Sequence, residues 1–337
     1  MRVGIVGANG FLGGELVRLL SAHPEVRLAA LVAGRSAGQQ LSSLRPGLRG
    51  PADAVLEAFD ADALAAACEV VFLALPHGES GVAGAALRQR GVRVVDLGSD
   101  FRLRDPADHV RFYGREPTAP ELLDEAVYCL PELTGPPPPL AGLIASPGCF
   151  ATALLLTLAP LQDGLGPEGV TVFGATGSSG SGVAPSAGVH HSLRMTSFTG
   201  YKTLAHQHLG EVGQALAARG PAPRLRFVPH SLPVARGILL TTVIPEGQLG
   251  GASALERLTA AYADAALVDV VQGEVPLGAV QHSVRTLIGV VERGGDTVIY
   301  TAIDNLLKGG SGQAVQSLNL AQGWSETLGL PVVGSWP

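Results

Sequence analysis

A cysteine near the middle of the chain stands where its thiol could act as a nucleophile. Cys149 follows Pro147-Gly148, which break the chain, and the apolar run from Phe150 to Leu158 predicts a helix that ends near Pro160. Cys149 is therefore expected at or just before a helix N-terminus, where unpaired backbone N–H groups and the helix dipole favour a thiolate. The alternative is a small core residue beside a tight turn, because free cysteine is among the most buried residue types.

Two histidines and an acid follow in the second half of the chain. If residues 204–216 form a helix, His208 and Glu211 lie three positions apart on one face, whereas His206 points elsewhere. A carboxylate beside an imidazole fixes its tautomer and raises its pKa, which suits a group that donates and accepts a proton. A metal site is the rival interpretation, but no third ligand cluster is evident and we predict none. A purely structural role for the segment stays open.

The first residues of the chain carry a phosphate-binding pattern. Residues 3–6 are typical of a short buried strand, and residues 11–20 have the apolar spacing of a helix. The turn between them is of the form G-x-x-G-x-x-G, whose glycines let the backbone approach a pyrophosphate at the helix N-terminus. A glycine turn used only for packing is the alternative. The candidate cofactor contacts in this turn are Gly7, Gly10, Phe11, Leu12 and Gly13.

The end of the next strand indicates which dinucleotide would bind. The strand at residues 26–32 leads into Gly34, Arg35 and Ser36, where an NAD enzyme usually has an acid for the ribose 2′-hydroxyl. This chain offers a guanidinium and a hydroxyl, which suit a 2′-phosphate. We therefore predict NADP rather than NAD, with an ordinary solvated Arg35 as the alternative.

Further strands are expected at residues 70–75 and 92–97, separated by helix-like segments rich in Ala and Leu. Alternating strands and helices predict a Rossmann-type doubly wound parallel sheet, with ligands beyond the carboxyl ends of the strands. Two loops leave those ends. The first contains His77, which is expected to face solvent, and the second contains Arg102, either an anion anchor or a partner of Asp100.

Beyond Cys149 the pattern predicts a second, α+β domain. Strand-like runs at residues 170–173, 238–244, 284–291 and 298–303 are separated by long connections, which suggests a mixed or antiparallel sheet. The proline-rich connector at residues 135–139 places the boundary shortly after it. We expect an NADP-binding domain at 1–148, completed by a C-terminal helix at 308–337, and a catalytic, substrate and oligomerisation domain at 149–307.

Two glycine-containing segments of the second half could bind ligand. The Gly/Ser loop at residues 174–188 directly follows a strand, so Ser179 and Gly180 could cradle phosphate or nicotinamide through backbone amides, unless the loop is only a flexible linker. The segment from 303 to 316 runs from a strand into a helix. Its amide side chains Asn305 and Gln313 could bind the carboxamide of nicotinamide.

Composition limits the partners and the compartment. The 337 residues are 46% apolar and 15% charged, with net charge −6, which is typical of a well-buried globular protein and argues against nucleic acid or an anionic membrane as partner. The three cysteines, Cys68, Cys129 and Cys149, have neither zinc-site nor disulfide spacing. A strand at the very start and the absence of long apolar runs predict no signal peptide and no membrane helix, so we expect a cytoplasmic protein.

A nicotinamide cofactor, an activated cysteine and a histidine base together fit a small set of reactions. The natural one is reduction of an activated acyl group: the thiolate expels a good leaving group, and hydride reduces the resulting thioester to an aldehyde.

At this point the chain closely resembles the N-acetyl-γ-glutamyl-phosphate reductase family, relatives of aspartate-semialdehyde dehydrogenase. The resemblance covers nearly the whole length and rests on ordered motifs. Besides the N-terminal glycine turn they are Asp96-Leu-Gly-Ser-Asp-Phe-Arg-Leu103, Pro147-Gly-Cys-Phe-Ala-Thr152, Tyr201-Lys202 with His206-Gln-His208, Arg236-Gly-Ile-Leu239 and Asp304-Asn-Leu-Leu-Lys-Gly309.

The resemblance implies NADPH-dependent reduction of an N-acyl-γ-glutamyl phosphate to its semialdehyde, in arginine biosynthesis. It implies that Cys149 forms the acyl-enzyme and that His208, oriented by Glu211, handles the proton, with His206 as the other candidate. It also implies that Asn305 lies by the nicotinamide and that Arg102 contacts the acyl phosphate. A homo-oligomer, dimer or tetramer, is implied as well. The other substrate candidates that it supplies are Tyr201, Lys202 and Arg236.

Some positions depart from the family pattern. Many members have Tyr-Pro where this chain has Phe150-Ala151, and Gln207 replaces a common Arg. These departures leave the acyl group on the substrate nitrogen open. Two alternatives remain: a carrier-protein-linked α-aminoadipyl-phosphate reductase of lysine biosynthesis, and a catalytically silent NADPH-binding sensor.

Overall fold

The computed structural model describes residues 1–50 and 52–335, and the chain divides into two compact units. The first comprises Met1–Pro147 and Gly310–Leu330, and the second comprises Gly148–Gly309 and residues 331–335. The sequence pattern predicts all of 308–337 in the first unit. Residues 331–335 instead pair with the second unit, where the Val284 N–H donates to the Pro331 carbonyl at 2.9 Å and the Ser335 N–H to the Gln281 carbonyl at 3.1 Å.

The first unit contains a six-stranded sheet in the order β2-β1-β3-β4-β6-β5. Each pairing in it is parallel, which confirms the predicted doubly wound sheet. Every residue of β3 is buried, as expected for a parallel strand covered on both faces. The strands are β1 (Arg2–Val6), β2 (Arg27–Val32), β3 (Val70–Leu73), β4 (Arg93–Asp96), β5 (Val127–Tyr128) and β6 (Leu143–Ala145).

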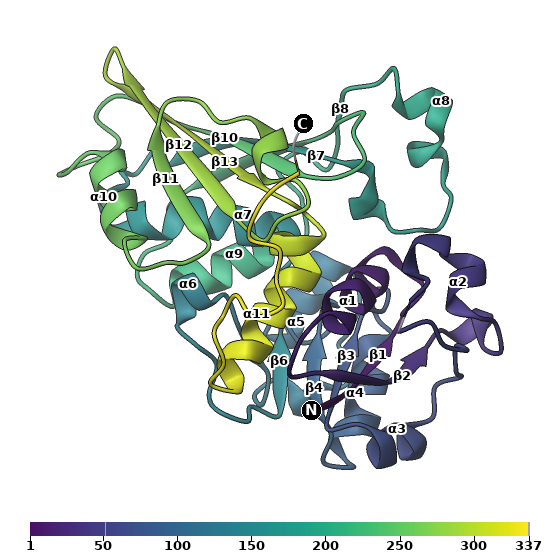
Figure 1. Ribbon diagram of the computed structural model, residues 1–337. Helices are drawn as coiled ribbons and strands as arrows, with labels where there is room; N and C mark the ends of the chain where they lie inside the picture. Colours follow the sequence, from purple (N-terminus) through teal and green to yellow (C-terminus); the bar gives the residue numbers. More distant parts are fainter. Residues whose placement is uncertain (51, 336–337) are drawn as a thin grey trace. The chain divides into compact units, whose positions relative to one another are not determined.

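Helices of the first unit follow the strands in alternation (Figure 1). The longer ones are α1 (Phe11–Ser21), α3 (Ala61–Ala67), α4 (Ser80–Arg88) and α11 (Gly312–Ala321), and the short ones are α2 (Leu41–Leu44), α5 (Pro106–Asp108) and α6 (Pro131–Thr134). Although α11 comes from the C-terminal part of the chain, it contacts α1 and β4 of this unit. The helix expected over 308–337 is much shorter than predicted, because α11 ends at Ala321.

The second unit contains a seven-stranded mixed sheet in the order β11-β12-β13-β10-β7-β9-β8, as the predicted α+β domain required. The central strand β10 is antiparallel to both β7 and β13, whereas β7 is parallel to β9. Along β10 buried and half-buried residues alternate, so one face of the sheet forms the core. The strands are β7 (Val170–Thr176), β8 (Thr199–Gly200), β9 (Leu225–Ser231), β10 (Ile238–Ile244), β11 (Val268–Gln272), β12 (Thr286–Arg293) and β13 (Asp296–Ile303).

The α-helices of the second unit, within the described residues, are α7 (Cys149–Leu158), α8 (His191–Arg194), α9 (His208–Ala217) and α10 (Ala254–Ala261). Residues 150–158 of α7 are all buried, and this helix contacts α9, β10 and β13. The helix predicted from 204 begins only at His208, because Lys202 and Leu204 have left-handed backbone conformations with φ of 44° and 60°. Within the described residues, no helix has the length and apolarity needed to cross a bilayer.

Candidate active site

Cys149 is the first residue of α7, in the position predicted from the sequence. The helix is capped by Gly148, whose extended backbone (φ −69°, ψ 150°) offers no capping side chain. The backbone N–H groups in the first turn of α7, where Cys149 lies, therefore receive no hydrogen-bond acceptor from a capping side chain. A Cβ at Gly309 would come within 2.7 Å of the Cys149 Cβ, so the backbone of the 304–309 turn lies directly against the cysteine. Cys149 itself is half-buried.

His208 and Glu211 are brought to the same place. His208 begins α9, and its Nε2 lies 4.0 Å from Oε1 of the fully buried Glu211. The other carboxylate oxygen of Glu211 accepts a hydrogen bond of 2.8 Å from the backbone N–H of Gly148. A Cβ at Gly148 would overlap the His208 ring, so only glycine leaves the imidazole room beside the residue before Cys149. One acid thus holds both the histidine and the turn that carries the cysteine.

His206 has a different environment from His208. It is buried among aromatic rings, with Phe150 at 5.3 Å and Phe227 at 5.6 Å between centroids. Its Nδ1 accepts the backbone N–H of His208 at 3.2 Å. Burial, reinforced by the charge of His208, lowers the pKa of His206 to about 2. A ring that stays neutral in this way does not donate a proton near neutral pH, so the arrangement favours His208 for the proton transfer.

Tyr201 and Lys202 differ in how they face the site. Burial raises the pKa of the Tyr201 phenol, and the charge of Cys149 raises it further, so the phenol is protonated and lies within electrostatic reach of the sulfur. The exposed Lys202 instead donates from Nζ to Oε1 of Gln207 at 2.6 Å. The ammonium group of Lys202 thus has its acceptor in Gln207, the residue that departs from the family pattern.

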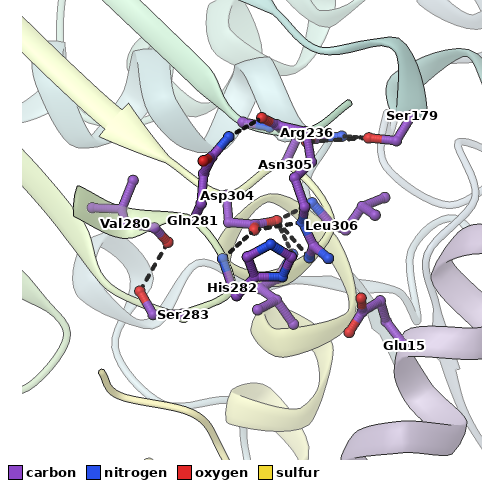
Figure 2. Close-up of polar contacts among 12 residues, drawn as sticks. Glu15, Ser179, Arg236, Val280, Gln281, His282, Ser283, Asp304, Asn305 and Leu306 are labelled. Carbon is purple, nitrogen blue, oxygen red and sulfur yellow. Dashed lines mark hydrogen bonds and ion pairs between the residues drawn. The ribbon is translucent and has the colours of Figure 1, made fainter. Parts of the chain in front are cut away.

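Arg236, expected to contact substrate, forms an ion pair with the fully buried Asp304 (Figure 2). Its Nε lies 2.7 Å from Oδ2 and its Nη2 2.9 Å from Oδ1, a two-pronged geometry. The same carboxylate accepts the backbone N–H groups of His282 and Leu306 at 2.7 and 2.9 Å. Asp304 therefore ties two other segments of the chain, at Arg236 and His282, to its own turn.

Asn305 links the Gly/Ser loop, a predicted cofactor contact, to Gly237, which follows the substrate candidate Arg236. Its Oδ1 accepts the Gly237 N–H at 2.6 Å and its Nδ2 donates to Ser179 Oγ at 3.0 Å. Ser179 lies in the glycine-rich loop after β7, and Gly180 beside it is exposed. The amide of Asn305 is thus engaged by protein groups, and it orders the loop whose backbone could meet a ligand.

In the first unit, Arg102 is buried and binds backbone. Its Nε donates to the Ser146 carbonyl at 2.8 Å and its Nη2 to the Leu97 carbonyl at 2.7 Å. These contacts hold the end of the segment that leads to Cys149. Direct contact of Arg102 with an acyl phosphate stays a prediction. Asp100, the alternative partner of Arg102, pairs with Arg115.

The predicted dinucleotide turn has the cradle that a pyrophosphate needs. Gly7 has φ +88°, and a Cβ there would overlap the Ala74 carbonyl oxygen. A Cβ at Gly13 would overlap the Gly7 carbonyl, while Gly10 caps α1 without any side-chain hydrogen bond. The N–H groups at the start of α1, including those of Phe11 and Leu12, are therefore approachable. The residues present fit a dinucleotide.

The segment after β2 also has the form expected for the ribose site. Gly34, Arg35 and Ser36 form a single 3₁₀ turn in which Gly34 and Arg35 are exposed. The Ser36 hydroxyl accepts from Asn9 Nδ2 at 3.0 Å, which ties this turn to the glycine turn. Nothing in the described residues groups three or more His, Cys, Asp or Glu side chains as metal ligands.

Sequence reasoning missed a network at the carboxyl ends of β3 and β4. Asp100 accepts the Gly78 and Gly81 N–H groups at 3.0 and 2.8 Å and pairs with Arg115. His77 is exposed, as predicted, and its Nδ1 also lies 2.7 Å from Ser99 Oγ. The loops themselves can be found by their position after strands, but Arg115 lies well outside them in the sequence and carries no signal.

Both units match models of one class of enzyme, the semialdehyde dehydrogenases. Residues 2–137 match the model "Semialdehyde dehydrogenase, NAD binding domain", and residues 149–305 match "Semialdehyde dehydrogenase, dimerisation domain". The fold agrees: the aspartate semialdehyde dehydrogenase II of Vibrio cholerae superposes with a TM-score of 0.70 at 16% identity, over 95% of this chain and 97% of that chain. An aspartate semialdehyde dehydrogenase from Candida albicans gives 0.65 at 17%, over 96% and 99%.

Sequence relatives narrow the class. The N-acetyl-γ-glutamyl-phosphate reductases of Magnetococcus marinus and Halorhodospira halophila are 39% and 41% identical, over 100% and 98% of this chain and 99% and 98% of theirs. The putative [LysW]-L-2-aminoadipate/[LysW]-L-glutamate phosphate reductase of Cenarchaeum symbiosum is 35% identical over 98% of each chain. The chain belongs to the N-acetyl-γ-glutamyl-phosphate reductase family of semialdehyde dehydrogenases, which confirms the resemblance found in the sequence.

Proposed function

We propose that the protein reduces N-acetyl-γ-glutamyl phosphate to the semialdehyde with release of phosphate, as the names of its full-length relatives indicate. The observation that carries this proposal is the placement of Cys149 at the start of α7 with His208 against the preceding glycine. That arrangement supplies a nucleophile and a proton carrier in one place. Family membership makes a catalytically silent sensor the poorer explanation.

In this mechanism His208 takes the thiol proton of Cys149, and the sulfur attacks the acyl carbon. The C–O bond to phosphate breaks, its electron pair leaves with the phosphate, and His208 returns the proton to that leaving group. The result is a thioester on Cys149. NADPH, when bound, supplies the hydride that reduces it. The C–S bond then breaks, its electron pair returns to sulfur, and the aldehyde is released.

Glu211 and Tyr201 have supporting roles in the proposal. The carboxylate of Glu211 orients His208 and stabilises its protonated form during the first step. The protonated phenol of Tyr201 lies within electrostatic reach of the sulfur. Neither residue has to change its own protonation state during the reaction.

We propose NADP rather than NAD as the cofactor of the NAD(P)-binding unit. Two observations support the choice: an exposed Arg35 beside Ser36 at the end of β2, and the likeness in fold to the Candida albicans enzyme, whose crystal structure is one with NADP. Arg35→Leu should raise the KM for NADPH by about 10- to 100-fold and leave the KM for NADH within about threefold, as expected for loss of charge-assisted hydrogen bonds. Equal losses for both cofactors would contradict the assignment.

The test of the reaction is the reverse assay. With N-acetylglutamate semialdehyde, phosphate and NADP, the enzyme should produce NADPH absorbance, and Cys149→Ser should remove nearly all of it. Cys68→Ala is a matched control, because Cys68 is a buried core thiol of the other unit. A Cys149→Ser protein that keeps most of the activity would rule out the covalent mechanism.

The 35% identical relative from Cenarchaeum symbiosum supports a second candidate substrate, an acyl phosphate carried on a protein. Phe150 and Ala151, two of the departures from the common pattern, are buried in the core of the second unit. Comparing free and carrier-linked semialdehydes in the same reverse assay decides between them. We expect the free N-acetyl compound to give the higher kcat/KM.

The second unit matches a dimerisation domain, and we propose that the protein is a homodimer or a tetramer built through that unit. The segment from 193 to 204, between β7 and α9, carries four large exposed apolar side chains, which supports this proposal, because exposed apolar surface is characteristic of interfaces. We call this segment the 193–204 strip; its exposed apolar residues are Leu193, Met195, Phe198 and Leu204.

A further inference from the structure

Two buried polar atoms at the carboxyl end of β7 have no hydrogen-bond partner among the described residues: Thr176 Oγ1 and Arg194 Nε. Thr176 is the last residue of β7 and is 7% exposed. Arg194 ends α8, and its Nη2 donates to the Thr176 carbonyl at 3.2 Å. The guanidinium and the hydroxyl therefore belong to one location, and neither residue is singled out by the sequence.

Such a pair needs an explanation. A buried donor left unsatisfied destabilises the folded state, more so when it is charged, and a bound ligand or water can complete it. Burial lowers the pKa of the Arg194 guanidinium, the direction expected for a cation removed from water. Arg194 is thus poised to gain from an anion that enters beside it.

The position of Arg194 connects it to the nucleophile. The Tyr201 phenol interacts electrostatically with both Arg194 and Cys149, because each shifts the Tyr201 pKa, Cys149 upward and Arg194 downward. A Cβ at Gly180, in the loop beyond β7, would lie 3.8 Å from Thr176 Oγ1 and 4.0 Å from Asn305 Nδ2, so Thr176 and the 304–309 turn border the same loop. Because that turn also lies against Cys149, Thr176 and Arg194 belong to the same end of the second unit as the cysteine.

Other cations of the second unit near the site are already engaged. Arg236 is held by the Asp304 carboxylate, and Lys202 by Gln207. Arg194 differs because its buried Nε has neither a hydrogen-bond acceptor nor a carboxylate partner among the described residues, whereas the Nε of Arg236 lies 2.7 Å from Asp304 Oδ2. Of these three cations, Arg194 is therefore the one whose unsatisfied N–H group an added oxyanion could complete.

We propose that Arg194 and Thr176 form an oxyanion subsite that binds a negatively charged oxygen group of the substrate, its carboxylate or the transferred phosphate. The planar guanidinium matches either group, and the hydroxyl of Thr176 adds a second donor. The identity of the substrate rests on the proposed function; the anion-binding role of Arg194 does not.

The kinetic test uses the reverse reaction of the full-length enzyme, with the semialdehyde and phosphate varied separately. Arg194→Met should raise one KM by about 10- to 100-fold with a smaller change in kcat, because an interaction made in both ground and transition states is lost. Thr176→Val should raise the same KM by a smaller factor, and Arg194→Lys should fall between. Arg257→Met, which removes a half-buried arginine on α10 whose Nε donates to the Ala252 carbonyl, is the control and should change neither KM.

The two sources of the anion give different results. A rise in the semialdehyde KM alone assigns the carboxylate to the subsite, and a rise in the phosphate KM alone assigns the phosphate. Both KM values within about twofold of wild type in Arg194→Met would overturn the proposal.

A binding measurement separates this proposal from the proposed reaction. Calorimetric titration with inorganic phosphate and with N-acetylglutamate should show that at least one of them binds wild type, and that Arg194→Met binds it about tenfold or more weakly. Wild type that shows this binding but no turnover would reject the reaction and keep the subsite. Equal binding by Arg194→Met, or no binding to wild type, would overturn the subsite.

Discussion

At the scale of single residues, the site depends on glycines and acids that make room for and orient the chemical groups. Gly148 and Gly309 have no side chain, so the His208 ring and the Cys149 side chain can each lie against backbone. Glu211 then joins the two through its two oxygens. The proposed nucleophile and its proposed proton carrier thus each lie against main chain.

Replacing His208 is predicted to lower kcat more than replacing His206. His208→Asn should lower kcat by about 10²- to 10⁴-fold, the usual loss for a general acid–base group. His206→Asn removes a ring that is neutral throughout the accessible pH range, so its loss should be smaller and should leave the pH profile of kcat unchanged. Steady-state pH profiles of both variants check this. A larger loss at His206 would contradict the assignment of the proton transfer.

Asp96 makes a prediction about stability and pH. Burial raises its pKa from 3.8 to about 6, so the folded protein binds this proton more tightly than the unfolded chain does. The stabilising effect of that proton is complete below the unfolded pKa and is lost as pH rises to the folded one. The loss corresponds to about 3 kcal/mol, from about 1.4 kcal/mol for each unit of pKa.

Asp96→Asn should remove that penalty while keeping an acceptor for the Gly98 N–H, which Asp96 Oδ1 binds at 2.9 Å. Relative to wild type, the variant is expected to gain unfolding free energy at pH 8 and to gain little at pH 4. Urea unfolding at both pH values measures the difference. The same difference at the two pH values would show that the carboxyl does not titrate as described.

At the scale of elements, the turn before α1 and the turn after β2 give a matched pair of glycines. Gly13→Ala places a Cβ on the Gly7 carbonyl, whereas Gly34→Ala meets nothing within 4 Å. We expect Gly13→Ala to weaken NADPH binding by about tenfold or more and to lower stability by about 1–3 kcal/mol. Gly34→Ala should change stability by less than about 0.5 kcal/mol. Thermal unfolding and NADPH titration check both; equal effects would contradict the packing.

Elements with a strong local pattern could be predicted, and those set by distant contacts could not. The apolar run behind Cys149 is helix α7, and residues 238–244 are strand β10 as predicted. The strand β9 is not predicted, because Pro229 and His230 interrupt its apolar pattern. In the structure these residues are part of the strand, which pairs in parallel with β7. The start of α9 is predicted too early because the left-handed Lys202 and Leu204 have no sequence signature.

The candidate site shows the same division. Cys149, His208, Glu211 and the glycine turn lie in motifs whose chemistry is local, so sequence spacing could find them. The partner of Arg236 is Asp304, 68 positions away, and the pairing depends on strands β10 and β13 running side by side. Arg194 carries no motif. Only the burial of its Nε in the folded chain distinguishes it from a surface arginine.

At the scale of the whole molecule, the prediction concerns assembly. Light scattering should give a mass about two or four times 34.4 kDa for the wild-type protein. Replacing Leu193 and Phe198 of the 193–204 strip by Ser should lower that mass, because both side chains are more than half exposed in the single chain. Leu140→Ser, an equally exposed leucine of the first unit, is the control. An unchanged mass in the strip variant would exclude that surface from the interface.

The most direct test of the covalent mechanism is the mass of the intact enzyme after mixing with N-acetyl-γ-glutamyl phosphate in the absence of NADPH. We predict release of about one phosphate per active site and a matching acyl adduct that maps to Cys149, which NADPH then discharges as the semialdehyde. Phosphate release and turnover without any adduct, or an adduct on another residue, would contradict the account.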